Sequence, residues 1–503
     1  MTDGIGLAEA LLGLDGFRVL EVKEKPAEVV IHVETYAEAA GCASCGTRAE
    51  AQGRMRVEIR DLACFGRPAR LVWRKRRWRC ADADCEAKTW TESSPHVSSR
   101  TVLTCRAGVE ACRQVGMNAR PVAGLARELG VCWSTVMEAV VEHGTPLVDD
   151  PGRVGAVATL GVDETSFLAA NPEHATIYAT GLVDLDDHKI IDMVEGNAAA
   201  DLRQWCSMKD PAWLAAIATV ATDLTESYRA GLDPHLAHAV RVADPFHVVR
   251  IANRCVDQVR RRVQNETLHH RGRKDDPLYR IRKLLLSGAE RLNEHGNDRM
   301  LLGLRIGDPN DELLGAWLAK ESVRDIYLSA DRGEAAILVD KAIAGCRSDE
   351  VEEIRSLGRT LAAWRTEILA HHDTGASNGP TEGLNLLVKK VKRCGHGFRS
   401  FKNYRLRVLL HAGGVTWPTP SRLPRVRERS LSFASRMGPA DEQFCQRHGT
   451  TPVASYGTTL RVHHRRPKSH SAGPPMPMRR RLHGVQGGHG GAGQRGASAL
   501  VAR

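Results

Sequence analysis

The sequence has no uninterrupted apolar run long enough to cross a lipid bilayer, so we expect no membrane-spanning helix. Its first residues, MTDGIGLAEALLGLDGF, lack the basic start and the small-residue cleavage site of a secretory signal. The cysteine count is odd, at 13, which in a chain of 503 residues argues against a framework of disulfide bonds. These absences predict a cytoplasmic protein whose cysteines are reduced.

The positive charge is unevenly distributed. The chain has a net charge of +11, but residues 417–503 hold 15 Lys and Arg against 3 Asp and Glu, so residues 1–416 are close to neutral. This tail is rich in Pro, Gly and Arg and cannot bury a core, so we expect it to be disordered. It either binds nucleic acid loosely or is a run-on translation without a role. In residues 1–416, local basic clusters would mark a phosphate-binding surface.

Four cysteines form two closely spaced pairs, in CASC and CADADC: Cys42, Cys45, Cys80 and Cys85. Two pairs of thiolates on short loops suit a tetrahedral zinc ion, which would stabilise a small domain. We place this zinc-binding domain at residues 40–95, after an N-terminal segment of residues 1–39. Chance pairing among the cysteines is the alternative, and Cys64 and His96 are possible substitute ligands.

The stretch GRPARLVWRKRRWRC alternates basic and apolar residues and predicts a strand that enters the second cysteine pair. Its cations are candidate contacts to a nucleic-acid backbone, with a solvated strand face as the alternative. These candidates are Arg74, Lys75, Arg76, Arg77 and Arg79.

Residues 96–150 predict a helix-turn-helix domain. In PVAGLARELGVCWSTVMEAVVEHG, one helix covers residues 122–129, Gly130 takes the turn, and a second helix begins near Trp133. Small Ala126 suits the crossing of the two helices, and Val136 would pack the second helix back. Ser134 and Thr135 would then face a major groove. An ordinary helical hairpin is the alternative.

Residues 154–414 predict an α/β domain. Three strands in a meander are followed by helix, strand, helix and strand, which is the order of a ribonuclease-H-like fold. The segment of about 256–372 has apolar residues at helical spacing and predicts a helical insertion after the fifth strand.

Three carboxylates fall at places in this fold where they would converge. Asp163 and Asp223 are expected at or just past the ends of the first and fourth strands, which are neighbours in the sheet, and Glu382 is expected in the first turn of a later helix. Mg²⁺ prefers carboxylate oxygens, and phosphodiester chemistry uses two such ions about 4 Å apart. Each acid alone could equally be a helix cap or a surface acid. Glu164 is a possible auxiliary.

Cations follow Glu382 on the same helix, in SNGPTEGLNLLVKKVKR. Lys389 and Arg393 fall on roughly the face of Glu382, where backbone phosphates would lie. A solvated basic face, with Glu382 complementing the helix dipole, is the plain alternative.

Residues 40–416 resemble the DDE transposases of bacterial insertion sequences in the ISL-three family. The resemblance rests on the paired cysteines, the helix-turn-helix and the motifs GVDETSF, ATDLTESY, VADPFHVVR and GPTEGLNLLVKKVKRCGHGFRSFKNYRLR. It implies that Asp163, Asp223 and Glu382 are the catalytic triad. It further implies that Asp244 and His247 match an Asp-x-x-His element that supports the site or flanking DNA, with a buried hydrogen-bonded histidine as the alternative.

The resemblance implies a bacterial, nucleoid-associated enzyme that binds the terminal inverted repeats of its element. It would cleave double-stranded DNA and join the ends to a target, with Mg²⁺ or Mn²⁺ as cofactor, structural Zn²⁺, and a homo-oligomer that brings two ends together. A catalytically inactive DNA-binding regulator and a structure-selective nuclease of the same fold are the alternatives.

Overall fold

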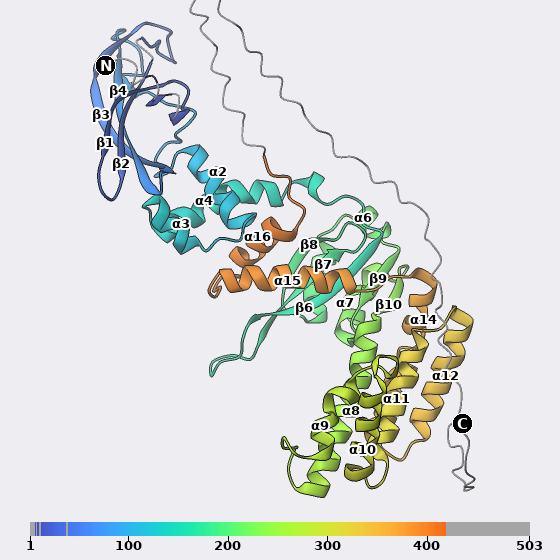
Figure 1. Cartoon of the computed structure of the whole chain (residues 1–503). Helices are drawn as coiled ribbons and strands as arrows, with labels where there is room; N and C mark the ends of the chain where they lie inside the picture. Colours follow the sequence, from blue (N-terminus) through green and yellow to red (C-terminus); the bar gives the residue numbers. More distant parts are fainter. Residues whose placement is uncertain (1–5, 7, 10–11, 37–38, 419–503) are drawn as a thin grey trace, which may run out of the picture. The chain divides into compact units, whose positions relative to one another are not determined.

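The computed structural model describes residues 6, 8–9, 12–36 and 39–418, which contain two five-stranded sheets and a large set of helices (Figure 1). The predicted disordered tail, 417–503, lies outside the described residues except for its first two positions. Within the described ranges, no helix is long and apolar enough to cross a membrane.

The first sheet has the strand order β1-β2-β4-β3, with the short β5 paired to β4. Its strands are β1 (Phe17–Glu24), β2 (Val29–Thr35), β3 (Ala49–Cys64), β4 (Arg67–Cys80) and β5 (Thr89–Thr91). The predicted strand that enters the second cysteine pair is therefore confirmed as β4. Phe17, Val33 and Trp73 are buried together in its core, so this sheet begins within residues 1–39 rather than after them.

Three helices follow: α2 (Cys105–Gly116), α3 (Val122–Leu129) and α4 (Trp133–Val148). The two helices predicted around Gly130 are confirmed, and Gly130 ends α3 with a left-handed φ of 67° that favours glycine. Ala126 and Val136 are buried, as expected for the crossing of the two helices.

The second sheet has the strand order β10-β9-β6-β7-β8. Its strands are β6 (Thr159–Leu168), β7 (Ile177–Asp184), β8 (Lys189–Glu195), β9 (Thr219–Thr222) and β10 (Val240–Ala243). β6, β7 and β8 form the predicted antiparallel meander, whereas β9 and β10 run parallel to β6. The predicted neighbourhood of the first and fourth strands is confirmed by the pairing of β6 with β9.

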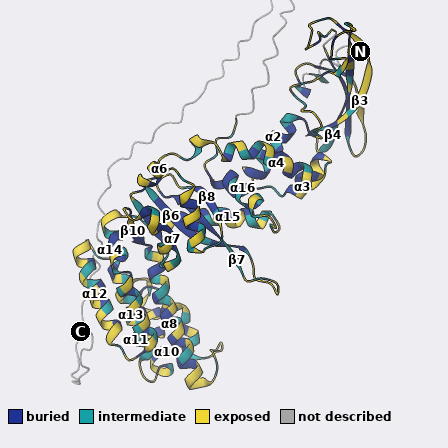
Figure 2. Cartoon of the chain, turned by 180° about the vertical axis from the view of Figure 1, so that it is seen from behind, coloured by how far each residue is buried: buried dark blue, intermediate teal, exposed yellow. Residues whose placement is uncertain are grey.

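Helices cover both faces of this sheet (Figures 1 and 2). Leu160 and Val162 of β6 pack with α5 (Ala199–Ser207) and α7 (Glu226–Leu236), near the short α6 (Pro211–Ala215). The opposite face packs against α15 (Gly379–Cys394) and α16 (Phe401–Ala412). Because side chains alternate along a strand, Gly161 and Asp163 point toward the α15 face.

The region predicted as a helical insertion is helical, with its own buried core. Its helices are α8 (Pro245–Leu268), α9 (Pro277–Leu286), α10 (Glu294–Gly307), α11 (Glu312–Ile326), α12 (Arg332–Ser348), α13 (Glu352–Ala363) and α14 (Arg365–Thr374). The first of them begins directly after β10 and continues into the predicted insertion. It therefore carries residues of the sheet edge as well as residues of the insertion.

Candidate active site and zinc site

The parallel pairing of β6 with β9 ends at Val162 and Thr222, so Asp163 and Asp223 are the next residues on two neighbouring strands. Asp223 lies just past β9, as predicted. Asp163 does not end its strand: β6 continues to Leu168, because its pairing with β7 continues after its pairing with β9 has stopped. The two carboxylates nevertheless meet, and ligand atoms of Asp163, Asp223 and His247 lie within 4.8 Å of one another.

Asp163 is buried and held on both carboxylate oxygens. The backbone N–H of Glu164 donates to Oδ1 at 2.8 Å, and the side-chain amide of Asn385 donates to Oδ2 at 2.6 Å. Burial, together with the negative charge of Asp223, raises the pKa of Asp163 to about 6. Glu164 accepts a hydrogen bond from Asn197 at 2.8 Å and lies outside this cluster, although it lines the same cleft as Asp163 and Asp223.

Asp223 is contacted by two residues of α8. Its Oδ1 lies 2.7 Å from Nδ1 of His247, and its Oδ2 accepts from Nη2 of Arg250 at 3.2 Å. Nδ1 of His247 directs its hydrogen bond to Oδ2 of Asp244, 2.9 Å away, so Oδ1 of Asp223 is buried without a hydrogen-bond donor among the described residues.

His247 is buried between Asp223 and Asp244. Burial alone would lower its pKa, but the close carboxylates of Asp223 and Asp244 raise the pKa of His247 to about 9. Asp244 is the N-cap of α8 and also accepts the backbone N–H of Asn378 at 2.8 Å. Although burial opposes the shift, these bonds lower the pKa of Asp244. Asp244 and His247 thus form a charged pair that lies directly against Asp223.

Glu382 lies in the first turn of α15, as predicted, and lines the same open cleft of about 610 Å³ as Asp163 and Asp223. It is not within ligand distance of the cluster that those two acids make with His247. Lys389 also lines the cleft. Arg393 is exposed farther along α15 and is not part of the cleft wall.

The donor set fits a hard divalent cation. Two carboxylates approach closely in a buried place, which is why the pKa of Asp163 is raised by burial and by Asp223. Oδ1 of Asp223 lies 2.7 Å from Nδ1 of His247 but accepts no hydrogen bond among the described residues, and a buried carboxylate oxygen is costly to leave unpaired. Oxygen-rich sites of this kind suit Mg²⁺ or Mn²⁺.

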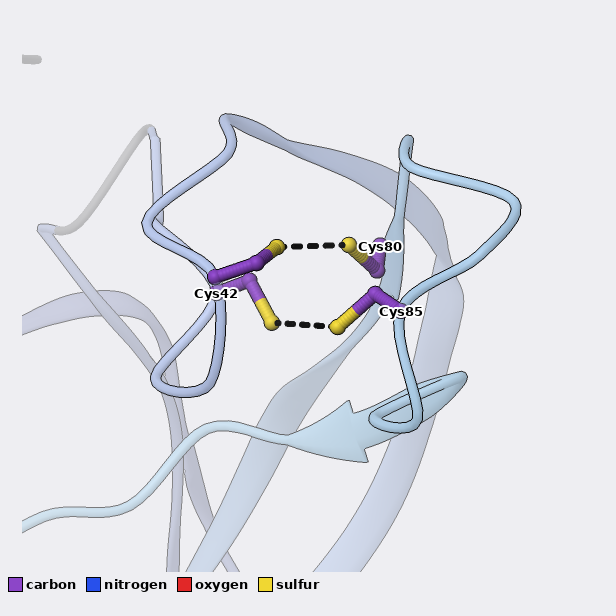
Figure 3. Close-up of side chains that lie close together, drawn as sticks. Cys42, Cys80 and Cys85 are labelled. Atoms are coloured by element: carbon purple, nitrogen blue, oxygen red, sulfur yellow. Dashed lines mark hydrogen bonds between the residues drawn. The ribbon is translucent and has the colours of Figure 1, made fainter.

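The paired cysteines come together at one end of the first sheet (Figure 3). The Sγ atoms of Cys42 and Cys85 are 3.6 Å apart, those of Cys45 and Cys80 are 3.4 Å apart, and all four lie within 4.8 Å of one another. Zn–S bonds of about 2.3 Å in a tetrahedron require sulfurs about 3.8 Å apart. The cluster therefore supports a structural zinc ion.

The two proposed substitute zinc ligands were wrong. Cys64 ends β3 at the hairpin, whereas Cys80 ends β4 at the opposite end of the same strand pair. The ring of His96 packs near Phe17, with ring centroids 6.3 Å apart. Neither residue belongs to the cysteine cluster.

Among the predicted backbone contacts on β4, Arg74, Arg77 and Arg79 are exposed and Lys75 is half-buried. The prediction that Arg76 contacts a nucleic-acid backbone was wrong, because its side chain is only 8% exposed. Its guanidinium donates to the backbone carbonyl of Thr35 at 2.9 Å and lies 3.8 Å from Glu92. Arg76 thus holds the end of β2 and is not available to a phosphate.

Ser134 and Thr135 lie in the first turn of α4, where Ser134 is exposed and Thr135 is half-buried. Their hydroxyls lie 3.0 and 2.9 Å from Sγ of Cys132, the N-cap residue. Both side chains therefore stand at the start of the second helix of the pair.

Sequence reasoning missed three residues that organise the site: Arg250, Asn378 and Asn385. In the sequence Asn378 lies in a predicted turn. Its buried hydrogen bonds go to Val162 of β6 and to Asp244 after β10, both far away in the sequence. Asn385 and Arg250 could have been found from the sequence. Asn385 follows Glu382 by three positions and Arg250 follows His247 by three positions, so each shares a helix face with a predicted site residue.

Two family models and two known transposases match parts of this chain. The ISL3 family model described as "Transposase" matches residues 160–408, and the model described as "zinc-finger of transposase IS204/IS1001/IS1096/IS1165" matches residues 38–85. The transposase for insertion sequence element IS1001 from Bordetella parapertussis is 24% identical over 414 residues, covering 80% of this chain and 97% of the relative. The transposase for insertion sequence element IS1557 from Mycobacterium tuberculosis is 25% identical over 291 residues, covering 54% of this chain and 63% of the relative. The two family matches together cover more than half of the sequence, and the chain belongs to the ISL-three family of insertion-sequence transposases.

Proposed function

We propose that this transposase cleaves the ends of its insertion sequence and joins them to target DNA by DDE phosphoryl transfer. The observation that carries the proposal is the meeting of Asp163 and Asp223 on adjacent strands, in a cleft that Glu382 also lines. The three carboxylates come from β6, the end of β9 and α15, so the whole α/β region contributes to one site.

The catalytic domain is proposed to be ribonuclease-H-like and to span residues 154–414, with the helical insertion between β10 and α15. The order β8-β7-β6-β9-β10, with β9 and β10 parallel to β6, supports this proposal. The zinc-binding domain is proposed to include β1 and β2 together with residues 40–95, because they share one sheet, and the helix-turn-helix domain is proposed at residues 96–150.

Asp163, Asp223 and Glu382 are proposed to hold Mg²⁺ or Mn²⁺. When bound, these ions activate the attacking oxygen and stabilise the leaving oxygen of the phosphodiester. His247 keeps Asp223 in place through its charge, while Asn385 holds Asp163. Lys389, on the cleft wall, binds a backbone phosphate. Water attacks a phosphodiester at the element end and displaces the 3′ hydroxyl of the element. This hydroxyl then attacks a target phosphodiester and displaces a 3′ hydroxyl of the target strand.

The N-terminal regions are proposed to recognise the terminal inverted repeats. Arg74 and Arg77 contact phosphates from β4, and Ser134 and Thr135 reach base edges from the start of α4. Arg393 extends the phosphate contacts along α15. Two ends must be cut together, so the active form is a homo-oligomer on bacterial DNA, in the cytoplasm.

A plasmid that carries the DNA flanking this gene tests the proposal. Wild-type protein with Mg²⁺ should cut at the element ends, and Asp223→Asn should bind the same ends without cutting. Binding without cutting by both proteins would contradict the catalytic role and favour a regulator. Cutting that ignores the end sequence would favour a nuclease.

A further inference from the structure

Arginines face one another across the long β3–β4 hairpin of the first sheet. The register of the antiparallel strands places three arginine pairs opposite each other: Arg54 with Arg76, Arg56 with Arg74, and Arg60 with Arg70. Within each strand the three arginines are separated by even numbers of positions, and residues directly opposite each other in the register share a face. All six side chains therefore lie on one face of the sheet. Like charges directly opposite each other on a sheet are destabilising unless something neutralises them.

The two outer pairs are neutralised by glutamates of the same sheet. Glu28 accepts from Arg60 at 3.0 Å and from Arg70 at 2.6 Å. At the other end, Glu34 lies 3.5 Å from Arg54 and 4.0 Å from Arg76. Each outer pair is thus bridged by one carboxylate, an anion held between two guanidinium groups.

The middle pair has no such bridge. Arg56 and Arg74 are both exposed, and within residues 12–36 and 39–418 neither forms an ion pair or a hydrogen bond through its side chain. The nearest acid along β3, Glu58, is engaged by Arg70 at 2.7 Å. Burial, and also the positive charges of Lys23, Arg56 and Arg70, lower the pKa of His32 on the adjacent strand, which agrees with an excess of positive charge on this face.

We propose that Arg56 and Arg74 together bind one phosphate group of the DNA backbone, which takes the place that a glutamate takes in each outer pair. The inference rests on the proposed binding of DNA by the N-terminal regions and adds to it a residue on β3. It also assigns the contact to the strand pair rather than to β4 alone. A phosphate oxygen can accept from two guanidinium groups at once, so the pair forms a clamp with a fixed spacing.

The proposal predicts effects of opposite sign on stability and on binding. Arg56→Gln removes the repulsion and should leave the Tm unchanged or raise it, while weakening DNA binding roughly tenfold. Arg56→Glu should build the missing bridge to Arg74, raise the Tm further and weaken binding more strongly. In Arg56→Gln the slope of log K against log salt should fall by roughly 1.

The probes are duplexes that carry an element end and duplexes of unrelated sequence, because a phosphate contact should weaken both equally. Arg299→Gln, which removes an exposed charge from α10, serves as the matched control and should change neither quantity. A lower Tm with unchanged DNA affinity would overturn the inference and make the pair structural. Failure of the wild-type protein to bind either duplex would instead overturn the proposed function.

Discussion

The side-chain amide of Asn378 donates to the backbone carbonyl of Val162 at 3.2 Å, which ties the start of α15 to the residue before Asp163. The backbone N–H of Asn378 donates to Asp244, and its side-chain oxygen accepts from Thr381 in the next helical turn. Asn378 is fully buried. One residue therefore sets the positions of the strand carrying Asp163, the support for Asp223 and the helix carrying Glu382.

Replacing this side chain should separate catalysis from DNA binding. In Asn378→Ala, the first turn of α15 loses its anchor to β6, and a displacement of about 1 Å costs on the order of 10²-fold in rate. We expect cleavage to fall by that factor while the Kd for DNA stays unchanged. Asn297→Ala, an exposed position on α10, is the control. A parallel loss of DNA affinity would show that the helix no longer folds in place.

Asn385 should set the acid limb of the cleavage pH profile. Burial and Asp223 raise the pKa of Asp163 to about 6, whereas the bond from Asn385 favours the ionised form. Asp163 must be ionised to hold a cation, so activity should rise with pH through this range. In Asn385→Ala the pKa of Asp163 rises further, and the acid limb should move to higher pH. An unmoved limb with a lower rate at every pH would contradict this role.

The close approach of α15 to β6 depends on Gly161. A Cβ atom there would lie 2.7 Å from Oγ1 of Thr381 and 2.9 Å from Oδ1 of Asn378. Gly161→Ala should cost about 1–3 kcal/mol of stability and push α15 away from the sheet, with a loss of cleavage. Gly181→Ala on β7 is the control, since its nearest neighbour is Sδ of Met193 at 3.5 Å. Equal effects of the two substitutions would rule out a specific approach at Gly161.

Much of this arrangement follows from local sequence patterns. A short apolar run ending in an acid placed Asp223 at the end of β9, and turn residues before Pro380 placed Glu382 in a first helical turn. Each prediction needs only a few neighbouring residues. Asp163 was placed at a strand end because the apolar run stops there, but β6 continues through pairing with β7.

Contacts between residues that are far apart in the sequence could not be predicted from local sequence patterns. Arg76 looked like its exposed neighbours because its burial comes from Thr35 and Glu92, which lie on other parts of the sheet. Arg56 was missed for the same reason, since its partner Arg74 is defined only by the strand register. Asn378 contacts Val162, 216 positions away, and no local pattern carries that information.

The cysteine cluster offers a test with an internal control. Cys85→Ser removes one of four converging sulfurs, so the protein should lose its zinc and the first sheet should lose stability. Cys64→Ser changes the same residue type in the same sheet, outside the cluster, and should retain one zinc per chain. Metal analysis and thermal melting of both variants measure these outcomes. Equal zinc content in the two variants would rule out the cluster as the site.

His247 should make stability depend on pH. Its pKa is about 9 in the folded chain, against an ordinary value of 6.5, because Asp223 and Asp244 outweigh the effect of burial. A histidine whose pKa is raised on folding stabilises the protein fully below pH 6.5, and this contribution disappears as the pH rises through 9. This contribution amounts to on the order of 3 kcal/mol.

Urea unfolding of wild-type protein in Mg²⁺-free buffer should therefore show a free energy of unfolding that decreases from pH 6.5 to 9. His247→Gln should lack this decrease, while His295→Gln, an exposed position on α10, should retain it. The same slope in His247→Gln and wild type would mean that His247 is neutral between the two carboxylates, and the charged support for Asp223 would have to be abandoned.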